Sequence, residues 1–89
     1  MQYDGSKSIR LSKHALEQCK ERGASEEDIR IAIIKSKWLP ARDNKLECKY
    51  SFQYNGQWAN KYYAIKEVRP IFVEEETEIV VITVYTYYN

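Results

Sequence analysis

The residue types that could do chemistry stand near the two ends of the chain. His14 is the only histidine, and imidazole is the side chain whose unperturbed pKa lies nearest neutrality. Arg22 follows about two helical turns later, on nearly the same face of a predicted helix. Thr83 and Tyr85 share one face of a predicted strand, because strand side chains alternate. A proton-transfer group beside a cation suits RNA cleavage without a metal ion. We therefore predict these four as catalytic residues.

Each of these residues also has a purely structural interpretation. His14 would then lie on the helix surface or pack against the sheet. Thr83 and Tyr85 would be present because β-branched and aromatic residues form good strands. The sequence leaves both interpretations open.

Basic and aromatic side chains are interleaved along the chain, a pattern typical of surfaces that bind unpaired bases. Bases stack on aromatic rings, and cationic side chains bind the phosphates between them. The predicted RNA-binding residues are Arg10, Lys13, Lys61, Tyr62 and Lys66, with further rings at Trp58, Tyr63, Tyr87 and Tyr88. Aromatic residues in strands are also common in cores, so the same pattern fits an ordinary interior.

We predict no metal site and no cofactor. Cys19 and Cys48 lie far apart without a Cys-x-x-Cys pair, so neither a zinc site nor a disulfide framework is expected. The glutamates between positions 74 and 78 fit a solvated turn better than a cation site.

Length and composition describe one small globular domain. The 89 residues are 44% hydrophobic and 30% charged, which excludes a disordered chain. A net charge of +1 excludes binding to nucleic acid by bulk charge alone, although four of the thirteen acidic residues gather at 74–78 and leave the rest more basic. There is no apolar stretch long enough for a membrane span and no secretory signal pattern. We expect a cytoplasmic protein without a membrane partner.

Two helices are predicted in the first half of the chain. Ser12 is suited to cap a helix over residues 13–22, and Gly23 stands where a left-handed C-cap belongs. A capping-box pattern at Ser25 then begins a second helix that should end near Lys37. Residues 1–8 are expected to form a flexible lead-in, and residues 9–89 a single domain with a short extended piece at its start.

Strands are predicted after residue 44, where alternation replaces helical periodicity. Asn55-Gly56 is a typical hairpin turn, and Pro70 implies an edge, a bulge or a break in the returning segment. The run from Glu78 to Tyr88 should be a central strand. The predicted fold is α+β, with two N-terminal helices packed on an antiparallel meander of three or four strands.

Several short strings also stand in an order known from one bacterial family: Leu11-Ser12-Lys13-His14-Ala15, Glu21-Arg22-Gly23-Ala24-Ser25, a short second helix ending in Ala32-Ile33, and the closing Ile79-Val80-Val81-Ile82-Thr83-Val84-Tyr85. From about residue 9 onward the chain resembles the family called domain of unknown function 4258. That family is similar to the RelE-like and barnase-like small ribonucleases (BECR-type domains), whose helices pack on an antiparallel sheet. Its members are mostly small bacterial proteins or toxin-like modules.

The resemblance implies a role for each candidate residue. His14 would be the general acid or base, Arg22 a phosphate clamp, and Thr83 or Tyr85 a support for the transition state. One position departs from the family, which commonly has a second arginine four residues after the histidine. Here that residue is Gln18, which carries no charge.

Three hypotheses follow. The leading one is a metal-independent endoribonuclease, the toxin half of a toxin–antitoxin pair, with RNA as substrate and an antitoxin protein as partner. The second is a non-catalytic module that binds RNA or a protein through its tyrosine-rich sheet, which Gln18 and the balanced charge favour. The third is a homodimer formed through an exposed strand edge.

Overall fold

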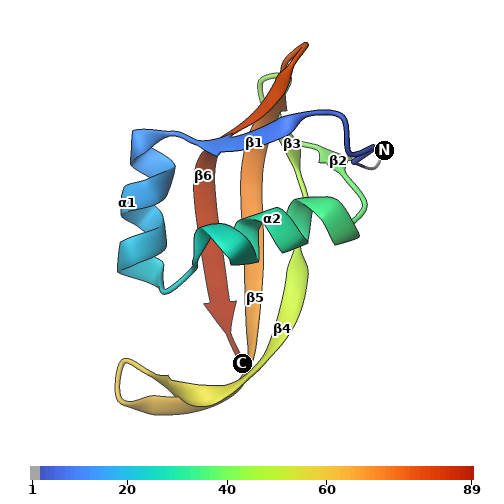
Figure 1. Cartoon of the computed structure of the whole chain (residues 1–89). Coiled ribbons are helices and arrows are strands. Elements are labelled where there is room, and N and C mark those ends of the chain that lie inside the picture. Colours follow the sequence, from blue (N-terminus) through green and yellow to red (C-terminus); the bar gives the residue numbers. More distant parts are fainter. Residues whose placement is uncertain (1–2) are drawn as a thin grey trace.

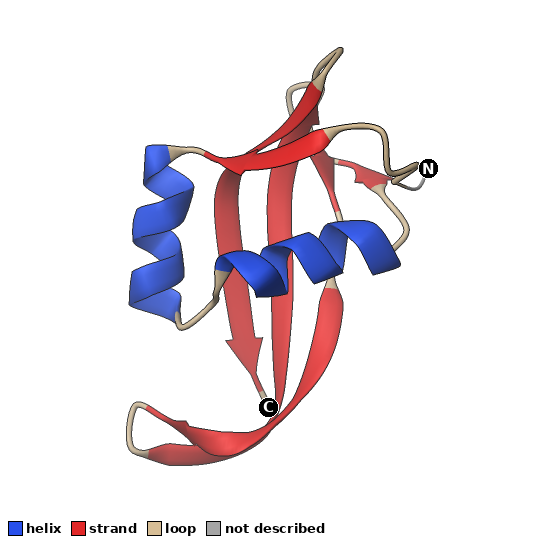
Figure 2. Cartoon of the chain, viewed as in Figure 1, coloured by secondary structure: helices blue, strands red, loops and turns tan. Residues whose placement is uncertain are grey.

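A computed structural model describes residues 3–89, which form two helices and a six-stranded mixed sheet (Figures 1 and 2). The elements in chain order are β1 (Ser8–Leu11), α1 (Lys13–Arg22), α2 (Glu26–Lys35), β2 (Leu39–Pro40), β3 (Leu46–Glu47), β4 (Tyr50–Trp58), β5 (Lys61–Glu74) and β6 (Glu78–Tyr88). Figure 1 shows α2 crossing one face of the sheet, and α1 standing beside β6. No helix within residues 3–89 is long and apolar enough to cross a membrane.

The sheet differs from the predicted antiparallel meander of three or four strands, which was wrong. Its order is β1-β6-β5-β3-β2, with β4 also paired to β5, and β1 runs parallel to β6. The four residues of β1 are too few to show a strand period, and their partners, which begin at Glu78, are distant in sequence. β2 and β3 have only two residues each, so they too leave no pattern to recognise.

Local capping chemistry sets the helix ends much as predicted. The Ser12 hydroxyl accepts a hydrogen bond from the Ala15 amide, and Gly23 ends α1 in the left-handed region at φ 75°. The reciprocal capping box of Ser25 begins α2. α2 ends at Lys35, two residues before the predicted Lys37, because Ser36 is already extended and its hydroxyl donates to the Lys49 carbonyl.

The core lies between the helices and the central strands. Trp38 is buried behind α2, where its indole nitrogen donates to the Ile33 carbonyl at 2.9 Å and its ring meets Phe72 edge-on at 5.0 Å. Both cysteines are buried free thiols. Other residues of this core are Leu11, Ala15, Ile29, Ala32, Val68, Ile79, Val81 and Val84.

The hairpin turn predicted at Asn55-Gly56 is wrong. β4 continues through that dipeptide to Trp58, and the chain reverses at Ala59 and Asn60, with φ 52° and 66°. Asn55 does adopt a positive φ of 47°, but at a β-bulge, where the register shifts between Gln53 and Gly56. The same positive-φ preference therefore serves a bulge within a long hairpin instead of the turn at its end.

The break predicted at Pro70 is not in the returning segment, because β5 continues through it from Lys61 to Glu74; the interruption lies in the neighbouring strands, between β3 and β4. Pro70 is buried in β5, opposite the interval between β3 and β4. Its carbonyl accepts from the Cys48 amide at 3.4 Å. Proline has no amide hydrogen to donate, and at this position no continuous partner strand needs one.

In the predicted lead-in, Tyr3 and Lys7 contact the rest of the domain, whereas residues 4–6 are exposed. The Tyr3 ring lies 6.5 Å from that of Trp38, and Lys7 pairs with Glu74 at 3.0 Å. Residue 8 already belongs to β1. Residues 1–2 of the predicted lead-in lie outside the described part of the chain.

Candidate functional site

A bulge in β6 sets which side chains reach the sheet face opposite the core, here called the open face. Thr83 pairs with Ile71 and Val81 pairs with Phe72, so Ile82 is the extra residue. The extra residue shifts the alternation, and Val84 is buried while Thr83 and Tyr85 emerge on the open face.

Three cross-strand pairs of β5 and β6 form successive rows on this open face. They are Ile71 with Thr83, Arg69 with Tyr85, and Glu67 with Tyr87. Residues two apart along a strand are about 7 Å apart, so neighbouring rows have that spacing. Along the open face, the first row therefore carries an aliphatic side chain and a hydroxyl, the second a cation and a tyrosine, and the third a carboxylate and a tyrosine.

Tyr85 lies between two arginines. The Arg22 guanidinium carbon is 5.2 Å from the centroid of the Tyr85 ring, and that of Arg69 is 5.9 Å away. Both distances are in the range of cation–π contacts. Arg69 comes from the neighbouring strand, whereas Arg22 reaches the ring from α1, across the edge of β6. Two of the predicted catalytic residues, Arg22 and Tyr85, are thus in direct contact.

α1 replaces a neighbouring strand along the second half of β6. β1 pairs with β6 only as far as Val81. Beyond it, Gln18 Oε1 accepts from the Val84 amide at 2.8 Å, and Arg22 Nη1 donates to the Val84 carbonyl at 2.5 Å. Gln18 is only 7% exposed. An arginine at position 18 could not bond to the Val84 amide, because a guanidinium group has only hydrogen-bond donors.

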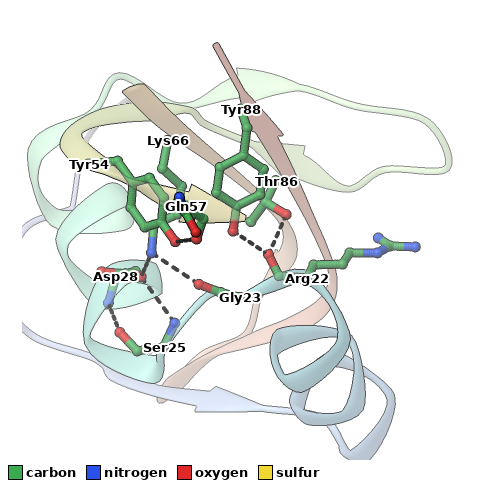
Figure 3. A network of polar contacts seen from close by, with 9 residues as sticks. All are labelled: Arg22, Gly23, Ser25, Asp28, Tyr54, Gln57, Lys66, Thr86 and Tyr88. Atoms are coloured by element: carbon green, nitrogen blue, oxygen red, sulfur yellow. Dashed lines mark hydrogen bonds and ion pairs between the residues drawn. The ribbon is translucent and has the colours of Figure 1, made fainter. Parts of the chain in front are cut away.

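The end of α1 is fixed by a polar network, which positions Arg22 (Figure 3). The Arg22 carbonyl accepts hydrogen bonds from the Thr86 and Tyr88 hydroxyls, each at 2.8 Å. The neighbouring Gly23 carbonyl accepts from Lys66 Nζ at 3.0 Å. Figure 3 shows the Arg22 side chain extending away from this network.

A hollow of about 700 Å³, here called the basic hollow, lies over Thr83 and Tyr85. Three cationic side chains line it against one carboxylate, Glu47, and that carboxylate bonds Arg69 at 2.6 Å. This hydrogen bond raises the pKa of Arg69. The lining residues are Pro40, Ala41, Arg42, Lys45, Glu47, Arg69, Ile71, Thr83 and Tyr85.

The β2–β3 turn supplies two of the three cations. Asp43 and Asn44 occupy its centre with φ 57° and 61°, so Arg42 and Lys45 flank the reversal and line the same hollow. Lys45 Nζ lies 3.8 Å from the exposed Asp43 carboxylate, which makes only a loose pair. The cations in this turn are therefore open to an anion from solvent.

A second hollow of about 640 Å³ adjoins the first and is here called the Glu67 hollow. Glu47 and Arg69 line both hollows, so their ion pair forms a shared wall. The lining residues are Ser36, Lys37, Leu39, Glu47, Cys48, Lys49, Glu67, Arg69 and Tyr87.

The predicted catalytic set is only partly brought together. Thr83 and Tyr85 line the basic hollow, and Arg22 contacts Tyr85. His14 is exposed in the first turn of α1, whereas Arg22 is in its last turn, about 12 Å further along the helix axis. The eight-residue spacing puts both on similar faces of the helix but at opposite ends of it.

The predicted RNA-binding residues do not share one surface. Arg10 lies on β1 and pairs with Glu78 at 3.1 Å, which lowers the pKa of that carboxyl. Lys13 is exposed at the start of α1, near β1. Lys61 and Tyr62 are exposed beside the turn of the β4–β5 hairpin.

Lys66 has a structural role instead of a free ammonium group. Its Nζ lies 2.8 Å from the Asp28 carboxylate and 3.0 Å from the Gly23 carbonyl, and its side chain is 11% exposed. It also lies 5.5 Å from the centroid of the Tyr54 ring. Lys66 thereby ties the sheet to the end of α1 through Gly23 and to α2 through Asp28.

Several residues of the two hollows were missed by sequence reasoning, namely Arg42, Lys45, Glu47, Glu67 and Arg69. One signal was available: the Asp43-Asn44 pair favours a tight turn, which would have placed the two flanking cations side by side. The other three stand in strands without a recognisable motif. Among the described residues, no group of histidine, cysteine, aspartate and glutamate is arranged to hold a metal ion.

No family model, curated protein or solved structure matches this chain. The resemblance to the domain of unknown function 4258 family therefore stays a prediction. A function for the chain has to be argued from the chemistry of the open face itself.

Proposed function

We propose that the chain is an RNA-binding domain that holds a phosphate of a single strand in the basic hollow. The observation that carries this proposal is the convergence of Arg42, Lys45 and Arg69 on one concave surface that contains Tyr85. Phosphate oxygens are good acceptors for guanidinium and ammonium groups. Thr83 also lines this hollow, and its hydroxyl adds a neutral donor.

The exposed rings beside the hollow support single-stranded RNA over a duplex. Tyr85 and Tyr87 are 37% and 44% exposed, and they emerge on the same face of β6. Flat sheet faces with exposed aromatic residues stack unpaired bases, which a duplex does not offer. The net charge of +1 means that binding depends on this local cluster, since the chain as a whole attracts a polyanion weakly.

Cleavage of the bound RNA is a second candidate function, favoured by the contact between Arg22 and Tyr85. In such a reaction the 2′-oxygen of the RNA attacks the adjacent phosphorus and loses its proton, while the 5′-oxygen leaves and gains one. Arg22 and Arg69 are placed to stabilise charge near Tyr85, whose hydroxyl is the titratable group at the centre of the site. His14 lies too far along α1 to act at this point.

A charge-matched comparison tests the binding proposal. The double variant Arg42→Gln/Lys45→Gln removes two cations from the hollow, and Lys13→Gln/Lys20→Gln removes two exposed cations from α1. Fluorescence anisotropy with a labelled single-stranded RNA gives affinity at several salt concentrations. The hollow variant should bind at least about tenfold more weakly, with a salt slope smaller by about 1.4, as loss of two phosphate contacts predicts. Equal weakening by both double variants would contradict the proposal.

A cleavage assay tests the second candidate on the same RNA. Incubation with excess chelator removes contributions from contaminating metal ions. Tyr85→Phe should abolish cleavage and retain binding, and His14→Ala should leave both unchanged. An intact RNA after incubation with the wild-type protein, alone and with ribosomes, would leave binding as the function of the site.

A further inference from the structure

Glu67 and Tyr87 face each other across β5 and β6 in the Glu67 hollow. The Tyr87 ring is exposed and Glu67 is half-buried beside it. Among residues 3–89, the carboxylate of Glu67 makes no hydrogen bond and no ion pair within 4.0 Å. Glu47, the other carboxylate of this hollow, is by contrast bound to Arg69. Glu67 is therefore an acceptor that is free for a ligand.

The surroundings of this pair fit a flat ligand with a polar edge. Leu39 and Cys48 provide apolar lining, and Lys37 and Lys49 supply positive charge to the same hollow. The wall toward the basic hollow is the ion pair of Glu47 and Arg69. A planar base that stacks on Tyr87 can thus turn its hydrogen-bonding edge toward the Glu67 carboxylate.

We propose that the Glu67 hollow recognises guanine in the RNA that the basic hollow binds, an inference that rests on the proposed function. Guanine carries two adjacent donors, N1–H and the N2 amino group, which match the two acceptor oxygens of a carboxylate. Adenine and cytosine place a ring acceptor beside their amino group, and uracil places carbonyls on both sides of N3–H. Each of these three would therefore set an acceptor against the carboxylate.

The spacing of the two hollows links this base to the neighbouring phosphate. Tyr87 and Tyr85 are two residues apart on one strand, so their rows are about 7 Å apart. A base stacked on Tyr87 therefore lies one row from Arg69, which lines both hollows and can hold a phosphate of the same strand. In this proposal the cations of the basic hollow provide affinity for the phosphates, and Glu67 provides the preference for one base.

The test is binding of four labelled pentauridylates that differ only in the central base, to the wild type and to Glu67→Gln. The matched control is Glu17→Gln, which removes an exposed carboxylate from α1. We expect the wild type and Glu17→Gln to prefer central guanine by about tenfold. Glu67→Gln should bind all four with similar affinity, near that of the wild type for uracil. Tyr87→Ala, but not Tyr87→Phe, should weaken binding of the guanine oligonucleotide.

The outcomes separate this inference from the proposed function. Equal binding of all four oligonucleotides by the wild type, or a guanine preference that survives in Glu67→Gln, overturns guanine recognition and leaves RNA binding intact. Failure to bind any oligonucleotide overturns both. Guanosine monophosphate that binds as tightly as the guanine oligonucleotide would assign the hollow to a free nucleotide and overturn the RNA form of the proposal.

Discussion

The side-chain oxygen of Gln18 accepts a hydrogen bond from the backbone amide of Val84 at 2.8 Å, in a place where a sheet would ordinarily have another strand. Arg22, one turn further along α1, donates to the carbonyl of the same residue. A helix thereby satisfies both backbone groups of one residue on the edge of β6. This contact also orients Arg22 toward Tyr85, and so joins the fold to the candidate site.

Gln18→Met should destabilise the protein by about 2 kcal/mol, because a buried backbone amide loses its acceptor while the side chain keeps a similar volume. Urea unfolding followed by circular dichroism measures the change. Glu17→Gln, on the exposed side of the same helix, should stay within about 0.5 kcal/mol of the wild type. Equal stability of Gln18→Met and the wild type would show that this hydrogen bond is unimportant.

Gly23→Ala should be more damaging than an alanine at another positive-φ glycine. A Cβ at Gly23 would overlap the Tyr88 hydroxyl and approach Trp58 Cζ3 to 2.8 Å, whereas one at Gly5, with φ 86°, would meet nothing within 4 Å. Backbone strain alone predicts a loss of about 1 kcal/mol at Gly5, and strain with overpacking predicts about 3 kcal/mol at Gly23. Thermal unfolding of both variants measures the difference, and similar losses would contradict the close packing of Trp58 and Tyr88 on the helix end.

Cys48 should be unreactive in the native protein. Burial, with a contribution from the charge on Glu47, raises the pKa of the Cys48 thiol to about 12. Because the folded-state pKa is above that of the unfolded chain, this thiol favours folding fully below about pH 9 and less as the pH rises toward 12. A thiol reagent at pH 9 should modify Cys48 in urea and leave it intact in the native state. Rapid native labelling would contradict this burial.

His14→Ala should leave RNA affinity unchanged, because His14 lies at the opposite end of α1 from Arg22. Tyr85→Ala should weaken binding by about tenfold, since it removes a stacking surface and the ring held between two guanidiniums. The two affinities, measured with the same labelled RNA, discriminate between the sequence-based and the structure-based view of the site. Weakened binding by His14→Ala together with unchanged binding by Tyr85→Ala would contradict the structure-based view and support a site around His14.

The helices were predictable because their signals are local. Ser12, Gly23 and the capping box at Ser25 act within a few residues of each helix end, so their sequence spacing is sufficient to locate α1 and α2. The parallel pairing of β1 with β6 depends on residues at opposite ends of the chain, and nothing within either segment specifies it. Asn55 shows a further limit, since a positive-φ preference does not distinguish a bulge from a turn.

The candidate site was predictable only where alternation governs it. That rule placed Thr83 and Tyr85 on one face correctly. Helical spacing predicted that His14 and Arg22 lie on similar faces of α1, but this argument ignored their separation along the helix axis. Arg42, Lys45 and Arg69 converge through the β2–β3 turn and through strand pairing, which are tertiary relationships. The basic hollow could therefore be recognised only from the folded structure.

The most direct test of the account is an NMR titration of the ¹⁵N-labelled protein with a short single-stranded RNA. We predict the largest amide shift changes in residues 42–47, 67–71 and 83–87, the segments that line the two hollows on the open face. Changes confined to the start of α1 around His14, or to the β4–β5 hairpin end at Lys61 and Tyr62, would contradict the assignment of RNA binding to the open face.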